Sequence, residues 1–187
     1  MNLKLAKKAL SAPGAVGIIP TDTVYGLVAR ATDRASVKRI YDLKNGRTKP
    51  GTIIAGSIDQ LVDLGLKRRY LLAVNDYWPA PLSVIIPCGN ELKYLHLGKS
   101  GLAVRIPRVK ALLNLTKDIG PLLTTSANMP GKKPASNLKE AKAYFSDRID
   151  FYIEGGDLSD HQPSTIIRVV DDTIELIREG AYEFKDI

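Results

Sequence analysis

Residues 15–27 read AVGIIPTDTVYGL, an apolar run followed at once by a crowd of polar groups. A continuous apolar run is typical of a strand that helices bury on both faces. Pro20 has no amide hydrogen to donate to a sheet, so the strand is expected to end there. Three hydroxyls and one acid then occupy positions 21–25. These groups either form a polar turn that ends the strand or bind a ligand.

Strands and helices alternate along the rest of the chain. Asp33 alone, Ser57 with Gln60, and Asn137 with Glu140 have the pattern of helix N-terminal caps. Residues 171–172 read DD and predict a hairpin turn. The sequence therefore predicts an α/β fold, a mixed sheet flanked by helices in a single domain over residues 1–187. Helices are expected at 2–12, 34–44, 57–64, 67–78, 108–116 and 137–145, and strands at 15–20, 52–56, 82–87, 101–107, 121–126, 164–170 and 173–179.

Composition sets the class of protein. The chain has 187 residues, 44% of them hydrophobic and 25% charged, which is ordinary for a soluble globular domain. No apolar run reaches transmembrane length, and residues 1–14 lack a continuous apolar signal segment. We expect a cytoplasmic protein that does not bind membranes. Cys88 is the single cysteine, so the sequence predicts no disulfide, no cysteine metal cage and no metal site, and the thiol is expected to be structural.

Charge is distributed unevenly. Residues 1–137 hold 21 Lys and Arg against 8 Asp and Glu, whereas residues 138–187 hold 6 against 12. An excess of 13 positive charges in the first portion indicates an anionic partner, such as a nucleotide or RNA phosphate. A solvated basic face is the alternative, and charge alone does not decide between them.

Two clusters with phosphate-binding chemistry lie beside predicted strand ends, although the phosphate loop and the dinucleotide-binding glycine motif are missing. Residues 43–51 place Lys44, Arg47 and a third cation on a loop rich in glycine and proline, which suits phosphate oxygens. A solvated helix C-terminus would look the same. Residues 124–134 present Ser126 and Asn128 after a strand; an ordinary loop that satisfies its own backbone is the alternative.

A further cluster places charge inside apolar strands. Arg105 lies within the run AVRIP, where an unpaired guanidinium is costly to bury. It is expected to pair with an acid such as Asp22 or with an anionic ligand. Ser164 and Arg178 follow in the last two predicted strands.

These strings together resemble the YrdC/TsaC family of L-threonylcarbamoyladenylate synthases. PTDTVYGL, LKNGR, LAVRIP, TTSAN, PSTII and LIREG occur in the family's order and approximate spacing over residues 20–180. The resemblance implies a YrdC-like twisted α/β fold with a basic concave cavity. It also implies a nucleotidyltransferase that joins L-threonine, bicarbonate or CO2, and ATP into threonylcarbamoyl-AMP and pyrophosphate. That product serves N6-threonylcarbamoyladenosine modification of tRNA, through a tRNA threonylcarbamoyltransferase complex.

The resemblance also implies roles for residues. No side chain is expected to act as a nucleophile, so catalysis rests on positioning and electrostatics. Mg2+ is expected with ATP. The threonine site is expected from Thr23, Arg105 and Ser164, and the ATP site from Lys44, Arg47, Ser126, Asn128 and Arg178.

The sequence departs from the family pattern in three places. Relatives usually have Lys-x-Arg-Pro, whereas here Lys44 and Arg47 are separated by two residues and threonine follows. Relatives often have a histidine near Ala55, where this chain is apolar. After TSAN they often have Ser-Gly, and this chain has Pro130-Gly131. These changes concern the loop contacts.

Two other functions compete with the synthase. The basic first portion would suit a double-stranded RNA-binding module without catalysis, but no aromatic residues cluster with the basic loops to stack on bases. Carbamoyl transfer in hydrogenase maturation uses the same fold, normally with companion domains.

Overall fold

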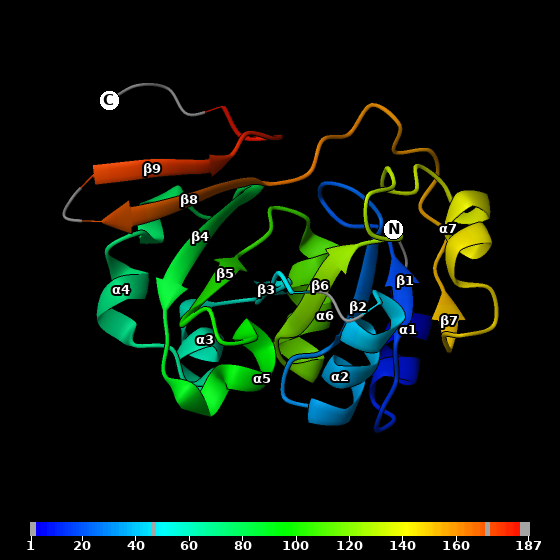
Figure 1. The fold of residues 1–187 in the computed structure, drawn as a ribbon, viewed down its shortest axis with the longest axis horizontal. Coiled ribbons are helices and arrows are strands. Elements are labelled where there is room, and N and C mark those ends of the chain that lie inside the picture. Colours follow the sequence, from blue (N-terminus) through cyan, green and yellow to red (C-terminus); the bar gives the residue numbers. More distant parts are fainter. Residues whose placement is uncertain (1–2, 46–47, 171–172, 184–187) are drawn as a thin grey trace.

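The computed structural model describes residues 3–45, 48–170 and 173–183. Within them, nine strands form one mixed sheet in the order β7-β1-β2-β6-β3-β5-β4-β8-β9. Figure 1 shows this sheet running from β9 at the left to β7 at the right. The predicted mixed α/β fold is confirmed. The strands are β1 Gly17–Ile19, β2 Gly26–Arg30, β3 Thr52–Ile54, β4 Leu82–Pro87, β5 Gly101–Arg105, β6 Leu122–Ser126, β7 Phe151–Tyr152, β8 Thr165–Val170 and β9 Thr173–Arg178.

The opening stretch is a hairpin, which the sequence reasoning did not predict. β1 pairs antiparallel with β2, with Ile18 opposite Leu27. Residues 20–25 are therefore the connection between two buried strands. β2 was missed because its few apolar residues follow the polar residues 21–25 directly and do not form a separate apolar run.

Three of the described helices begin where the caps predict. The Asp33 carboxylate accepts hydrogen bonds from the amides of Ala35 and Ser36. Ser57 and Asn137 accept from residues three positions further on. The helices are α1 Lys4–Leu10, α2 Arg34–Leu43, α3 Ile58–Leu64, α4 Arg68–Leu72, α5 Lys93–His96, α6 Lys110–Ile119 and α7 Leu138–Phe145.

One predicted helix was wrong in extent. The expected helix over 67–78 ends at Leu72 and is followed by a separate 3-10 turn, Asn75–Tyr77. The amide of Val74 bonds to the carbonyl of Leu71, three residues back, so the α-helical spacing is lost there. The short β7 and α5 were not predicted. The expected turn at 171–172 lies outside the described residues, although β8 and β9 do pair antiparallel.

Apolar side chains pack on both faces of the sheet, but one face is covered only in part. The larger core includes Ile40, Leu71 and Val104 beneath α2 to α5. A smaller core joins α1 and α6 to β1, β2 and β7 on the other face. Alternation along β5 turns Leu102 and Val104 to the large core and Ala103 to the opposite face. That face contains the cavities described next.

In the part of the chain that the structure describes, no helix has the length and apolar character needed to cross a bilayer.

Candidate functional site

The hairpin connection is a polar turn with its own hydrogen bonds. The Thr21 hydroxyl donates to the carbonyl of Val24 at 2.6 Å and accepts from the amide of Thr23 at 3.1 Å. The hydroxyls of Thr21 and Thr23 lie 3.0 Å apart. Because Thr21 has already used its single proton, Thr23 is the donor between them. The lone pairs of Thr23 remain available to a ligand.

Arg105 and Asp22 form a buried ion pair. Arg105 Nη2 donates to Asp22 Oδ1 at 2.9 Å, and the two side chains are 3% and 4% exposed. Burial lowers the pKa of the Arg105 guanidinium, and the adjacent Asp22 carboxylate opposes that shift. Within the described part of the chain, Arg105 Nε and Asp22 Oδ2 are buried without hydrogen-bond partners. Of the two partners that the sequence left open for Arg105, the structure shows the acid.

Ser164 is held from two sides. Arg178 donates from Nε to the Ser164 carbonyl at 3.1 Å and from Nη2 to the Ser164 hydroxyl at 3.1 Å. The Ser83 hydroxyl lies 2.9 Å from the Ser164 hydroxyl. The predicted nucleotide ligand Arg178 therefore also contacts the predicted threonine ligand Ser164. Ser83 was missed, because a serine within the apolar strand LSVIIP gives no indication that it contacts Ser164.

Lys44 ends α2 and is buried, at 2% exposure. Its Nζ donates to Asn128 Oδ1 at 2.7 Å, to the carbonyl of Ser126 at 3.0 Å and to the Asn128 carbonyl. The Ser126 hydroxyl also donates to Asn128 Oδ1, at 2.7 Å. For Lys44, the reading as a solvated helix end was wrong. Arg47, its predicted companion, lies outside the described residues.

Two side chains have structural surroundings. Tyr25 is fully buried, and its hydroxyl donates to the carbonyl of Gly156 at 2.9 Å and accepts from the amide of Gly155 at 2.8 Å. It therefore fixes the hairpin against the loop after β7. Burial raises the pKa of the half-buried Cys88 thiol to about 11, which leaves it protonated at neutral pH.

The predicted site residues gather around two neighbouring cavities. One, of about 110 Å3, is lined by Thr23, Arg105, Ser164 and Arg178; we call it the hydroxyl cavity. The other, of about 500 Å3, is lined by Lys44 and Asn128; we call it the lysine cavity. Ser126 lines both, so it marks their junction.

The hydroxyl cavity has lining residues that sequence reasoning missed. Thr52 and Thr124 face each other across β3 and β6, and both line it. The sequence offered no usable signal for them, because β3 reads TII and β6 reads LLTTS, and neither strand alternates polar with aliphatic residues. Among the described residues, no three His, Cys, Asp or Glu side chains form a group that could hold a metal ion.

Comparison with known proteins identifies relatives of this chain. The Sua5/YciO/YrdC family profile, described as "Telomere recombination", matches residues 9–180. A threonylcarbamoyl-AMP synthase of Marinobacter nauticus is 32% identical over 185 residues, covering 91% of this chain and 92% of the relative.

Solved structures share the fold. Pyrococcus abyssi Sua5 complexed with L-threonine superposes with a TM-score of 0.83 and 28% identity over 95% of this chain; the chain spans 54% of that protein. E. coli YciO gives a TM-score of 0.81 over 97% of this chain and 92% of its own, and at 23% identity it supports the fold alone. The family match covers nearly the whole sequence, and the chain belongs to the Sua5/YciO/YrdC family.

Proposed function

We propose that this chain is a threonylcarbamoyl-AMP synthase acting as a single domain over residues 1–187. The observation that carries the proposal is the junction of two unlike cavities at Ser126. A small cavity with a buried arginine suits a short amino acid, and a larger one with a buried lysine suits phosphates. Their shared wall would bring the two substrates together. Likeness to a Sua5 that was solved with L-threonine supports the same assignment.

The hydroxyl cavity would bind threonine. Arg105 would take the carboxylate, since its Nε has no partner among the described residues and Asp22 fixes its orientation. Thr23 presents lone pairs, which suit the hydrogens of the substrate amine. Ser164 would give a further hydroxyl contact to the same substrate.

The lysine cavity would bind the phosphates of ATP. Lys44 supplies the positive charge, and its hydrogen bonds to the 126–128 loop place Ser126 and Asn128 beside it. Arg47 would join them from the same loop as Lys44. Arg178 lines the hydroxyl cavity and would contact the nucleotide from that side.

The reaction needs no nucleophile from the protein. The amine of threonine and bicarbonate form a carbamate with loss of water. A carbamate oxygen then attacks the α-phosphorus of ATP, the bond to the β-phosphate oxygen breaks, and pyrophosphate leaves. The protein must hold three substrates, two of them anions, in line and stabilise negative charge on the phosphoryl oxygens.

Mg2+ would enter with ATP as part of the substrate. The described lining of the lysine cavity offers lysine, amide and hydroxyl groups, which are donors suited to phosphate oxygens. The ion would therefore be held by the triphosphate, where it would screen charge and assist the departure of pyrophosphate.

The product would be consumed outside this chain. Threonylcarbamoyl-AMP is a mixed anhydride, so a tRNA threonylcarbamoyltransferase complex would transfer its acyl group to adenosine in tRNA. We propose that this activity takes place in the cytoplasm.

The test is pyrophosphate release in the presence of ATP, bicarbonate and L-threonine. We expect release that requires all three, with threonylcarbamoyl-AMP formed in equal amount. Release that does not depend on threonine would refute the proposal.

The role of each cavity is tested by a pair of variants. Arg105→Ala should chiefly raise the KM for threonine, and Lys44→Ala should chiefly raise the KM for ATP. Arg68→Ala and Lys67→Ala remove the same charges from exposed positions and should change neither KM. Equal effects of both site variants on both substrates would contradict the assignment.

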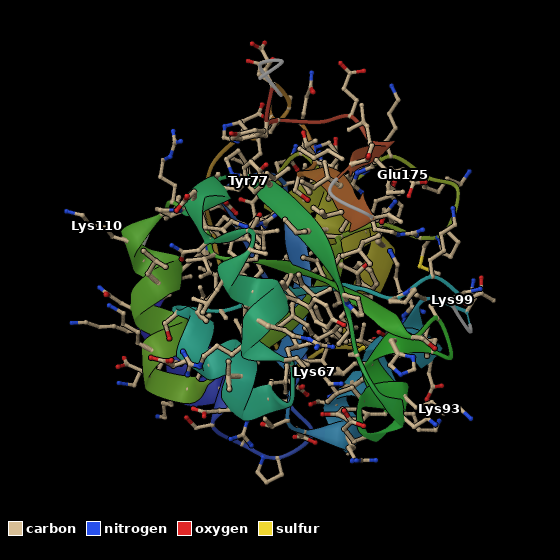
Figure 2. The ribbon with its side chains drawn as sticks, turned by 90° about the vertical axis from the view of Figure 1, so that its left-hand side faces the viewer. Lys67, Tyr77, Lys93, Lys99, Lys110 and Glu175 are labelled. Atoms are coloured by element: carbon tan, nitrogen blue, oxygen red, sulfur yellow. The ribbon has the colours of Figure 1, made fainter. Side chains whose placement is uncertain are left out.

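A second candidate is binding of double-stranded RNA. One observation favours it: Lys49, Lys99 and Arg168 line a third cavity of about 570 Å3 beside the hydroxyl cavity. Figure 2 shows Lys99 extending outward on the opposite side from Lys110. Contacts to phosphate alone would be lost as salt rises. Binding of duplex RNA that persists from 50 to 300 mM salt would support a dedicated RNA site, whereas loss of binding would indicate a nonspecific basic surface.

A further inference from the structure

Ser83 is a buried hydroxyl that the proposed mechanism does not use. It lies on β4 between Leu82 and Val84, which both belong to the large core. Alternation turns Ser83 to the opposite face of the sheet, the face that holds the hydroxyl cavity. Its side chain is fully buried. A buried hydroxyl is costly unless it is hydrogen-bonded, so its partner is informative.

That partner is Ser164. β4 runs parallel to β8, with Ser83 opposite Ile166, and this register brings the residue just before β8 to Ser83. The two hydroxyl oxygens lie 2.9 Å apart. Ser164 lines the hydroxyl cavity and is 4% exposed. Ser83 therefore lies directly behind a cavity residue without lining the cavity itself.

Arg178 decides how the protons of this pair are arranged. Its Nη2 lies 3.1 Å from the Ser164 hydroxyl, and a guanidinium can only donate. Ser164 thus accepts one hydrogen bond from Arg178. Its own single proton can go either to Ser83 or into the cavity. The proton goes into the cavity only when Ser83 is the donor between the two serines.

We propose that Ser83 is a positioning residue that donates to Ser164, so that the Ser164 hydroxyl donates into the cavity to the carboxylate of the amino-acid substrate. This inference rests on the proposed function. An anionic oxygen beside Ser164 would be repelled by its lone pairs and attracted by its proton. Bound carboxylate therefore selects the arrangement in which Ser83 donates, and Ser83 acts on binding through Ser164.

The first test is Ser83→Ala in the full chain. We expect the KM for threonine to rise about fivefold to tenfold, the effect of one hydrogen bond, with kcat and the KM for ATP nearly unchanged. Ser83→Thr restores a hydroxyl and should recover most of the affinity. The matched control is Ser36→Ala, which removes an equally buried hydroxyl whose bond is to the Asp33 carbonyl, and it should alter neither KM.

The second test asks whether Ser83 acts through Ser164. The variant Ser83→Ala/Ser164→Ala should have the same threonine KM as Ser164→Ala alone, because the relay is already broken. Calorimetric binding of L-threonine without ATP should show the same pattern independently of turnover. This comparison also covers the case in which Ser83→Thr fails to fold.

Several outcomes would overturn the inference while leaving the proposed function intact. They are an active wild type with an unchanged threonine KM in Ser83→Ala, equal rises in both KM values, or additive effects in the double variant. Absence of threonine-dependent pyrophosphate release in the wild type would instead overturn the proposed function.

Discussion

The ion pair between Arg105 and Asp22 is the part of the site whose energetics the structure defines best. We consider three variants: Asp22→Asn, Arg105→Met, and both changes together. Each single change leaves one charged group in a place that is at least 96% shielded from water, given side-chain exposures of 3% and 4%. The double change leaves two neutral side chains of similar size.

The expected magnitudes follow from this burial. Breaking a buried pair by removing one partner costs about 3–5 kcal/mol. A domain of this size loses about 2–4 °C in Tm for each kcal/mol, so each single variant should melt about 6–20 °C lower. Asp22→Asn should lie at the mild end, because the amide keeps an oxygen that can accept from Arg105. The double variant should recover about 2 kcal/mol relative to the sum of the single losses.

Urea unfolding measures these differences. The single tryptophan, Trp78, gives a fluorescence signal, and far-UV circular dichroism gives an independent one. We expect the transition midpoints to shift with unchanged slope, which means that the folded state and the surface exposed on unfolding are preserved. If the losses of the two single variants add within about 0.5 kcal/mol in the double variant, the pair is not coupled and the reasoning is refuted.

Three other perturbations have defined outcomes. Burial raises the pKa of Asp150, but hydrogen bonds from Arg39 and the amide of Val16 outweigh it and lower that pKa overall. Asp150→Asn should therefore be less stable than wild type at pH 7, and this difference in stability should vanish as pH falls from about 4 towards the lowered pKa. Urea unfolding at several pH values measures the difference. Gly26→Ala would place a methyl group 2.6 Å from Thr124 Oγ1 at the hydroxyl cavity, so its threonine KM should rise tenfold or more while the ATP KM holds, in steady-state kinetics. Phe145→Ala empties a fully buried position in the large core and should lower the free energy of unfolding by about 3–5 kcal/mol, and a loss below 1 kcal/mol would mean that the site collapses around the cavity.

Local features of the fold were predictable, and contacts between distant segments were not. The caps at Asp33 and Asn137 involve residues within three positions, so the sequence carries the whole signal. β2 was missed because strand identity depends on its pairing with β1 and β6. A short strand after a polar turn has no periodicity of its own to reveal it.

The site shows the same division. The resemblance to a family located Lys44, and the helix that ends there was predicted from its cap. Its burial against Asn128, 84 residues away in sequence, follows only from the pairing of strands. Nor could the sequence choose between Asp22 and a ligand as the partner of Arg105, since both satisfy the same charge. Ser83 differs again, because a serine inside an apolar strand has no special signature until its neighbour is known.

Three cations of the site share one design. Arg105 is held by Asp22, Lys44 by the Ser126–Asn128 loop, and Arg178 by Ser164. In each case an oxygen from a different strand or loop fixes a positively charged group beside a cavity. Substrate anions would thus meet cations that are already oriented, and little reorganisation would accompany charge development in the transition state. It follows that removing an oxygen partner, while the cation remains, should weaken substrate binding or turnover through geometry alone. The partners Asp22, Asn128 and Ser164 are therefore as much a part of the site as the charges they orient.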